Sequence, residues 1–204
     1  MVKIRFISFI IFSLPFLGIS QTLENLDYIS PFHEDLAAIQ KGDQWAIIDT
    51  DGSIVIDFRS DLVSTVFDYA TYPIFRDGLC LIEKEKDGIV YFGYINTLGN
   101  TVIEPQFINA SNFKDEKAIV LKLIKETAGE NTALGKNVVY YKYFEVIINK
   151  KGDVLSYLTK EGQNIVLDDS YLRNPPQISF SQISELLFVR RNKNEKLNLI
   201  KVDY

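Results

Sequence analysis

The feature that most constrains this chain is a turn sequence that occurs three times, each time between two apolar segments. An Asp or Asn is followed by two variable residues and a Gly in Asp49–Gly52, Asn96–Gly99 and Asn149–Gly152. The Asp or Asn side chain can accept hydrogen bonds from backbone N–H groups further round the turn, and Gly allows the left-handed conformation that closes it. Each copy therefore predicts a β-hairpin of one design.

A second motif precedes each hairpin and begins at Phe32, Phe75 and Phe113. In each copy an acidic residue stands two positions after the Phe, and a short apolar strand follows. A degraded fourth copy is expected from Phe180, followed by "LNLIKVDY" (197–204). The predicted unit is thus a Phe anchor, a strand, a turn, a strand, the Asp/Asn-x-x-Gly turn and a third strand.

These patterns predict an all-β fold class, with antiparallel three-stranded hairpin units stacked into a small repeat array. One such unit cannot bury its apolar face alone, so neighbouring units are expected to share a core. The repeat region is expected over residues 21–158. Residues 159–204 are expected to hold a linker, which contains Pro175 and Pro176, and the degraded fourth copy or a cap. For residues 59–70 a helical turn and a non-helical connector remain equally open.

Aromatic residues at fixed places in the units are expected to pack between one unit and the next. Gly93 is expected to let a neighbouring backbone or ring come close. The packing residues predicted in this way are Trp45, Phe92, Phe32, Phe75 and Phe113.

The units resemble the WG repeat family, in which an aromatic-Gly pair precedes an Ile-Asp/Asn-x-x-Gly turn and a "Val-Ile-x-Pro" strand. Unit two is the most similar, with Phe92-Gly93 and "NTVIEPQF" (100–107). The first copy keeps Trp45 but has Ala46, and the third has Glu145-Val146. The resemblance implies an interaction scaffold with a short, divergent array, and it carries no catalytic residues.

The first twenty residues have the order of a secretory signal peptide. Lys3 and Arg5 precede an apolar run from Phe6 to Leu17, and the small residues Gly18 and Ser20 come before Gln21. The run is short for a membrane span, which needs about 20 residues. We therefore expect export to a periplasmic, cell-surface or extracellular location, with no integral membrane span after cleavage. An uncleaved N-terminal anchor is the alternative.

Composition excludes several classes of function. The chain has 27 Asp and Glu against 22 Lys and Arg, so we expect no nucleic-acid partner. One Cys and one His leave no Cys/His metal site, and neither a cofactor nor a metal ion is expected. Cys80 is expected to be a buried thiol, and His33 to occupy a solvated position. Asp49 and Asp51 suggest calcium, but no EF-hand spacing follows them, so turn chemistry is favoured.

No motif predicts catalysis, and the chain is not expected to be an enzyme. The leading hypothesis is an exported repeat protein that binds another protein or a cell-envelope component. The alternative is a glycan- or small-molecule-binding module with exposed aromatic side chains. Tyr69, Tyr72 and Tyr140 are the candidate binding residues, and their exposure beside acidic groups in a concave pocket would favour this alternative.

Overall fold

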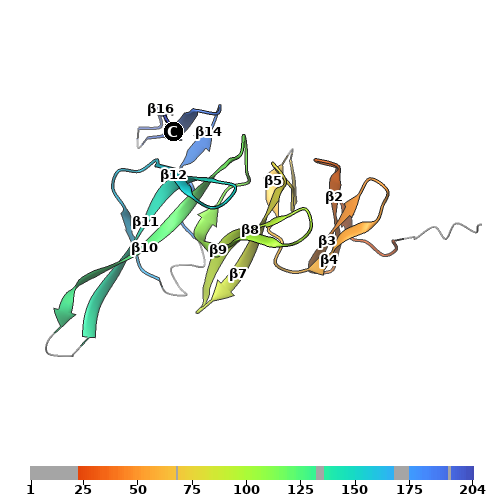
Figure 1. The fold of residues 1–204 in the computed structure, drawn as a ribbon, viewed down its shortest axis with the longest axis horizontal. Coiled ribbons are helices and arrows are strands. Elements are labelled where there is room, and N and C mark those ends of the chain that lie inside the picture. Colours follow the sequence, from red (N-terminus) through yellow and green to blue (C-terminus); the bar gives the residue numbers. More distant parts are fainter. Residues whose placement is uncertain (1–22, 68, 132–135, 168–174, 193) are drawn as a thin grey trace, which may run out of the picture.

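The computed structural model describes residues 23–67, 69–131, 136–167, 175–192 and 194–204. The proposed signal peptide lies outside these residues. Within them every regular element is a β-strand and every strand pairing is antiparallel, which confirms the all-β prediction. Figure 1 shows the strands of three successive units following one another along the long axis of the molecule.

Four units account for most of the strands, and we number them in chain order. Unit 1 comprises β2 (Leu36–Lys41), β3 (Gln44–Asp49) and β4 (Ile54–Arg59), and unit 2 comprises β7 (Leu79–Lys86), β8 (Ile89–Asn96) and β9 (Thr101–Ala110). Unit 3 comprises β10 (Lys117–Asn131), β11 (Lys136–Asn149) and β12 (Val154–Tyr157), and unit 4 comprises β15 (Leu187–Arg191) and β16 (Leu197–Lys201). The remaining strands are β1 (Tyr28–Ile29), β5 (Thr65–Phe67), β6 (Ala70–Tyr72), β13 (Gln163–Ile165) and β14 (Phe180–Gln182).

The described residues of the segment 59–70 contain no helix. Its residues form β5, the start of β6 and the approach to them, and the two short strands pair as a hairpin between units 1 and 2. The β-branched and aromatic residues of β5 favour this outcome over a helical turn. The helical alternative is therefore wrong, and the hairpin is an insertion in the connector between two units.

The Asp/Asn turns have one geometry in all three predicted copies. Asp49 Oδ1 accepts the N–H groups of Asp51 and Ser53 at 3.0 and 2.9 Å, and Gly52 has a φ of 79°. Asn96 and Asn149 make the equivalent pairs of hydrogen bonds at 2.9–3.0 Å, with φ of 78° at Gly99 and 87° at Gly152. The turn prediction is confirmed, and the side chain of Asp49 serves the turn.

The acidic residue of the Phe motif links one unit to the next. Glu34 accepts the backbone N–H groups of Asp77 and Gly78 at 2.6 and 2.8 Å, through its two carboxylate oxygens. Asp77 in turn accepts the N–H of Glu116 at 2.7 Å. These residues stand in two-residue turns with positive φ, which leave N–H groups pointing outward. The acidic position in the motif is thus explained by contacts between successive turns.

The core lies between the units, as a stacked array requires. Trp45, Phe75 and Ile95 share one cluster between units 1 and 2, and Tyr94 and Phe113 share another between units 2 and 3. Phe92 packs at the edge of the second cluster. These placements confirm four of the five predicted packing residues. Phe32 is the exception: it is 48% exposed, because no unit precedes it in the described structure.

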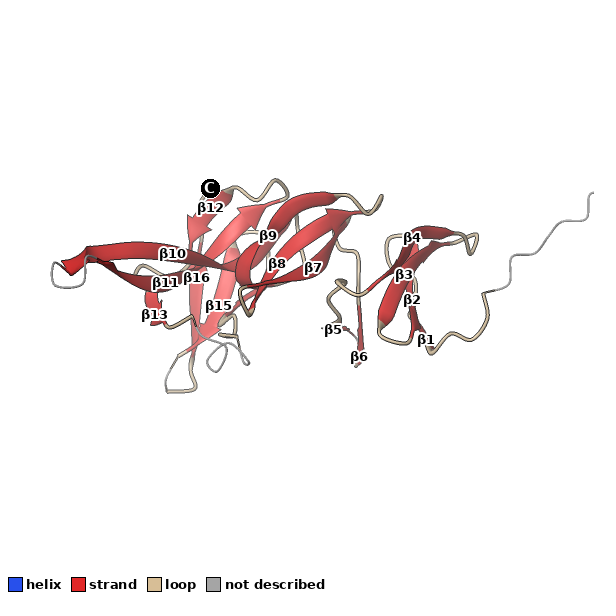
Figure 2. Ribbon diagram, turned by 90° about the horizontal axis from the view of Figure 1, so that it is seen from below, coloured by secondary structure: helices blue, strands red, loops and turns tan. Residues whose placement is uncertain are grey.

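Units 2 and 3 also share one continuous sheet. Strand β9 pairs with β8 on one side and with β10 on the other, in the order β12-β11-β10-β9-β8-β7. Both views show the outer parts of β10 and β11 projecting from the body as a two-stranded arm (Figures 1 and 2). β13 pairs with β11 near the base of this arm, at Tyr141–Tyr143.

Candidate binding surfaces

The three tyrosines predicted as a binding surface do not lie together. Tyr69 is fully exposed beside the β5–β6 turn, with a φ of 69°. Tyr72 is only 1% exposed and packs in the core between units 1 and 2, because the face of β6 that carries it is turned inward. Tyr140 lies on the β11 arm and is 38% exposed. Tyr72 is thus a core residue in this structure, and Tyr69 and Tyr140 belong to different elements.

Tyr140 forms a small polar cluster with its neighbours on the arm. Lys142 Nζ lies 3.1 Å from Glu126 Oε2 and 5.1 Å from the centre of the Tyr140 ring. The hydrogen bond to Glu126 raises the pKa of Tyr140, and the same bond, followed by the one from Lys142, lowers the pKa of Glu126. The cluster is solvent-exposed, so these contacts fix side chains on the arm without forming a closed site.

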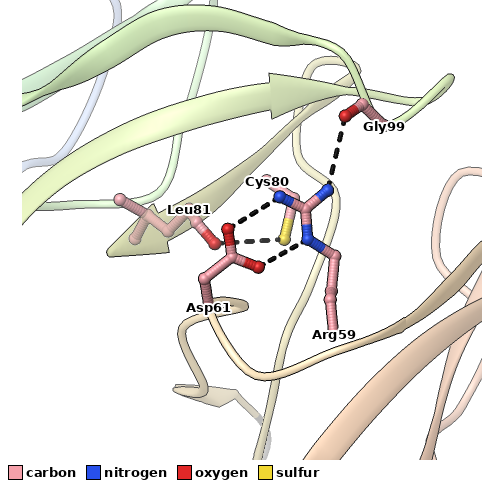
Figure 3. Close-up of polar contacts among 5 residues, drawn as sticks. All are labelled: Arg59, Asp61, Cys80, Leu81 and Gly99. Carbon is pink, nitrogen blue, oxygen red and sulfur yellow. Dashed lines mark hydrogen bonds and ion pairs between the residues drawn. The ribbon is translucent and has the colours of Figure 1, made fainter. Parts of the chain in front are cut away.

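An open hollow of about 540 Å³ lies where units 1 and 2 meet, beside Arg59. The guanidinium is already occupied: Nε and Nη2 contact the two carboxylate oxygens of Asp61 at 2.5 and 2.7 Å, and Nη1 donates to the Gly99 carbonyl at 3.3 Å (Figure 3). The hydrogen bond to Asp61 raises the pKa of Arg59. Arg59 therefore joins the end of β4 to the turn of unit 2, and it is not free to bind an anion.

Cys80 lies next to this contact but is closed to solvent. It is 1% exposed, its Sγ is 3.7 Å from the Leu81 carbonyl, and burial raises the pKa of its thiol to about 12 (Figure 3). A thiolate is the reactive form of cysteine, so this thiol is unreactive near neutral pH. The prediction of a buried thiol is confirmed.

His33 is partly exposed, so its expected solvated position holds only in part, and it has aromatic partners that were not expected. Its Nε2 lies 3.0 Å from the Tyr72 hydroxyl, and its ring meets Phe67 edge-on with centroids 4.7 Å apart. The inserted β5–β6 hairpin brings both aromatic residues to it, a contact between distant segments that no local pattern predicts. Arg76 is the residue of unit 2 that is equivalent to His33. It also packs on Phe67, with its guanidinium carbon 5.1 Å from the centre of the Phe67 ring.

Glu145 is a buried carboxylate that joins unit 3 to the segment before unit 4. It is 1% exposed. Its Oε1 accepts the Ser179 hydroxyl at 2.6 Å, and its Oε2 accepts the N–H groups of Ser179 and Phe180 at 2.9 and 3.3 Å. A buried carboxylate needs such donors, because its desolvation is otherwise costly. All of these donors belong to the chain itself, which makes Glu145 a structural group.

Unit 4 follows the register of the other units over two strands. Two pairs of residues define the register. The first is Leu187 with Lys201, which is equivalent to Leu36 with Asp49 in unit 1 and Leu79 with Asn96 in unit 2. The second is Val189 with Leu199, which is equivalent to Ala38 with Ile47 and Leu81 with Tyr94. Asp115 also reaches the region of unit 4, through a contact between side chains: Gln182 Nε2, at the end of β14, donates to Asp115 Oδ2 at 3.2 Å. The sheet order is β14-β15-β16, and the described residues after Lys201 add no strand to β16.

The side of unit 4 that corresponds to a stacking face is open. In units 1 and 2 the face turned toward the next unit includes Ile47 and Tyr94, which are 1% and 0% exposed. The equivalent Leu199 is 61% exposed, and Leu197, at the position of Trp45, is 63% exposed. Exposed apolar groups that gather on one face are typical of an interaction site.

The repeated sequence pattern is also matched by a protein-family model. The model of the WG containing repeat family matches residues 25–45 and 92–122. The chain therefore contains WG repeats. The second matched segment runs from β8 of unit 2 to β10 of unit 3, so the family repeat includes the junction between two of our structural units. No curated protein and no solved structure gives a significant match.

The WG pair itself has a steric explanation in unit 2. A Cβ atom on Gly93 would lie 2.6 Å from Pro105 N and 2.8 Å from Glu104 C, and closer still to the Ile103 carbonyl. The register explains the crowding, since Phe92 pairs with Phe107 and Tyr94 with Ile103, which leaves three residues opposite Gly93. The prediction that Gly93 permits a close backbone approach is confirmed.

Two further observations bear on the chemistry open to this WG-repeat protein. Among the described residues, no three His, Cys, Asp or Glu side chains are grouped so that they could hold a metal ion. In the same part of the chain there is no helix that is long and apolar enough to cross a membrane.

The groups that join the end of the array were not among the residues predicted from the sequence. Glu145 stands where unit 1 has Trp45, and only the fold brings it to Ser179. In unit 4 Ser184 and Leu187 exchange the turn hydrogen bonds that Lys114 and Lys117 exchange in unit 3. The residue equivalent to Phe113 is therefore Ile183, three positions after the predicted start at Phe180. The signal for this register was the Ser two positions earlier, because Ser30, Ser111 and Ser181 precede Phe32, Phe113 and Ile183.

Proposed function

We propose that this chain is an exported, non-catalytic WG-repeat protein that binds another protein, or a protein component of the cell envelope, through the open face of unit 4. The observation that carries the proposal is the exposure of Leu197 and Leu199 at positions that are covered by a neighbouring unit elsewhere in the array. A partner that covers these side chains gains about 25 cal/mol for each Å² of apolar surface removed from water. Export rests on the signal-like order of residues 1–20.

The arrangement of polar groups supports a binding role over a catalytic one. Arg59 and Glu145 are paired within the chain and hold successive segments together. The exposed tyrosines Tyr69 and Tyr140 lie on separate elements, so nothing in the described surface favours the glycan-binding alternative.

The test uses the mature chain as bait on its native envelope proteins, with chemical crosslinking and mass spectrometry. Crosslinks from Lys196 and Lys201, which flank the open face, should connect to one partner and be lost in Leu197→Lys. The control is Leu98→Lys, because Leu98 is 76% exposed in the turn of unit 2. Equal crosslinking by both variants would contradict the proposed surface. Recovery of full-length chain from the cytosol would contradict export.

A further inference from the structure

Unit 4 has the first two strands of a repeat unit, and no strand among the described residues pairs with the edge that a third strand would occupy. In units 1 to 3 the second strand is covered by an antiparallel third strand: β4 on β3, β9 on β8 and β12 on β11. In unit 4 the second strand, β16, ends the sheet order. The open face described above and this open edge adjoin, because both belong to β16.

The direction of the backbone groups of β16 is fixed by two hydrogen bonds. The Lys196 carbonyl accepts from Asn192, and the Val202 N–H donates to Leu186, so the even-numbered residues turn their backbone groups toward β15. The N–H and C=O groups of Leu197, Leu199 and Lys201 therefore point the other way. In unit 1 the equivalent of Lys201 is Asp49, whose N–H donates to Ser53 next to the third strand.

We propose that β16 of a second copy of this chain occupies the third-strand position, so that two copies associate through an antiparallel β16–β16 contact about a two-fold axis. The position calls for an antiparallel strand, and two copies of one strand pair antiparallel about such an axis. An unprotected edge strand is a template for this kind of pairing. The inference rests on the proposed function and deepens it by naming the partner.

The sequence of β16 selects a register for this contact. With Asn198 on the axis, Leu197 lies opposite Leu199 of the second copy, and both carry outward backbone groups that can exchange hydrogen bonds. The same register brings Lys201 toward Glu195 of the second copy, in the turn just before β16. Within one copy Lys201 pairs with Asp203 at 3.0 Å and Glu195 with Arg191 at 3.6 Å, both at exposed side chains, so the two groups can exchange these partners for each other across the axis. It also joins the exposed leucines of the two copies into one apolar stripe.

The experiment is sedimentation velocity of the mature chain from about 1 to about 200 μM, a range suited to weak association. The unaltered chain should form dimers as its concentration rises. Leu199→Lys should raise the dimer dissociation constant at least about tenfold. Leu98→Lys is the matched control and should dimerise normally. Circular dichroism and hydrogen exchange at Phe188 establish that unit 4 stays folded in each variant.

Charge reversal tests the register. Glu195→Lys should weaken the dimer by placing like charges opposite each other, and adding Lys201→Glu should restore it. A chain that stays monomeric, or a dimer unaffected by Leu199→Lys, overturns the inference, and so does a failure of the double variant to recover. If the chain is monomeric while envelope crosslinking still depends on Leu197, the proposed function stands and only the second copy is rejected as the partner.

Discussion

Units 2 and 3 are built on the same turn and the same register, yet they treat the WG position in opposite ways. Unit 2 has Phe92-Gly93, and its third strand bulges by three residues opposite the Gly. Unit 3 has Glu145-Val146, and Val146 pairs directly with Tyr157 without a bulge there. The Gly of the pair is thus required by a wide bulge, and where the bulge is lost this position can hold a larger residue.

Unit 1 is intermediate between these two and supports this explanation. Trp45 pairs with Arg59 and Ile47 with Ile56, so two residues stand opposite Ala46. Gly93, Ala46 and Val146 face three, two and one residues of the third strand, and the side chain at this position grows as that number falls. The size of the bulge therefore sets how large a residue the second position of the pair can hold.

The largest effect is expected at the first position of the pair in unit 1. Trp45 is 8% exposed in the cluster between units 1 and 2, so Trp45→Ala should lower the free energy of unfolding by about 3–5 kcal/mol, through lost burial and the cavity left behind. Urea unfolding followed by far-ultraviolet circular dichroism measures this. A cost below that of Leu98→Ala, an exposed turn position, would mean that the units do not stack through this residue.

Gly93→Ala tests the bulge directly. The added Cβ would meet backbone atoms that cannot move aside without breaking the β8–β9 pairing, so we expect a loss of about 3 kcal/mol. Ala46→Gly, at the equivalent position of unit 1, should cost only about 1 kcal/mol through added chain entropy. If the two changes cost the same in urea unfolding, the link between bulge size and residue size is rejected.

Glu145 gives the corresponding test for unit 3. Glu145→Gln keeps the shape but places an NH₂ group among the N–H and O–H donors of Ser179 and Phe180, so the variant should lose about 1–3 kcal/mol. Hydrogen exchange at the Ser179 and Phe180 amides should accelerate, while exchange at the Asn96 turn stays unchanged. The control is Glu161→Gln, because Glu161 is an exposed residue in the loop that follows β12. Uniform acceleration along the chain would show that Glu145 supports the whole array and not this junction.

These differences also explain which features of the structure could be predicted from the sequence alone. The hairpins at Asp49, Asn96 and Asn149 were predictable because the turn chemistry is local, with donors two and four residues from the acceptor. The stacking of Phe75 and Phe113 followed from periodic apolar positions. The place of His33 and Glu145 did not, because their partners are 39 and 34 residues away and are brought near by an insertion and by the connection to unit 4.

The predicted tyrosine surface shows the same limit. Alternation along a strand gives two faces, but it does not say which face the neighbouring unit covers. Tyr72 is buried between units 1 and 2, whereas Tyr140 on β11 is 38% exposed. The open face of unit 4 could be located only once the register of β15 and β16 matched that of the other units.

The smallest effect is expected at the Asp/Asn turns, which units 1 to 3 place between their second and third strands and unit 4 places between its first two strands, β15 and β16. Asn192 accepts the N–H groups of Asn194 and Lys196 at 2.9 and 3.1 Å, as Asn96 does in its own turn, but Glu195 takes the Gly position with a φ of 61°. A left-handed conformation costs a residue with a Cβ about 1–2 kcal/mol, and replacing that residue by Gly removes this cost. Gly also loses more conformational entropy on folding, which offsets part of the gain. Glu195→Gly should therefore stabilise the chain by up to about 1 kcal/mol, while Gly99→Ala should destabilise it by about 1 kcal/mol. Thermal unfolding of the two variants should shift in opposite directions, and a shift in the same direction would show that the two turns do not share one backbone geometry in solution.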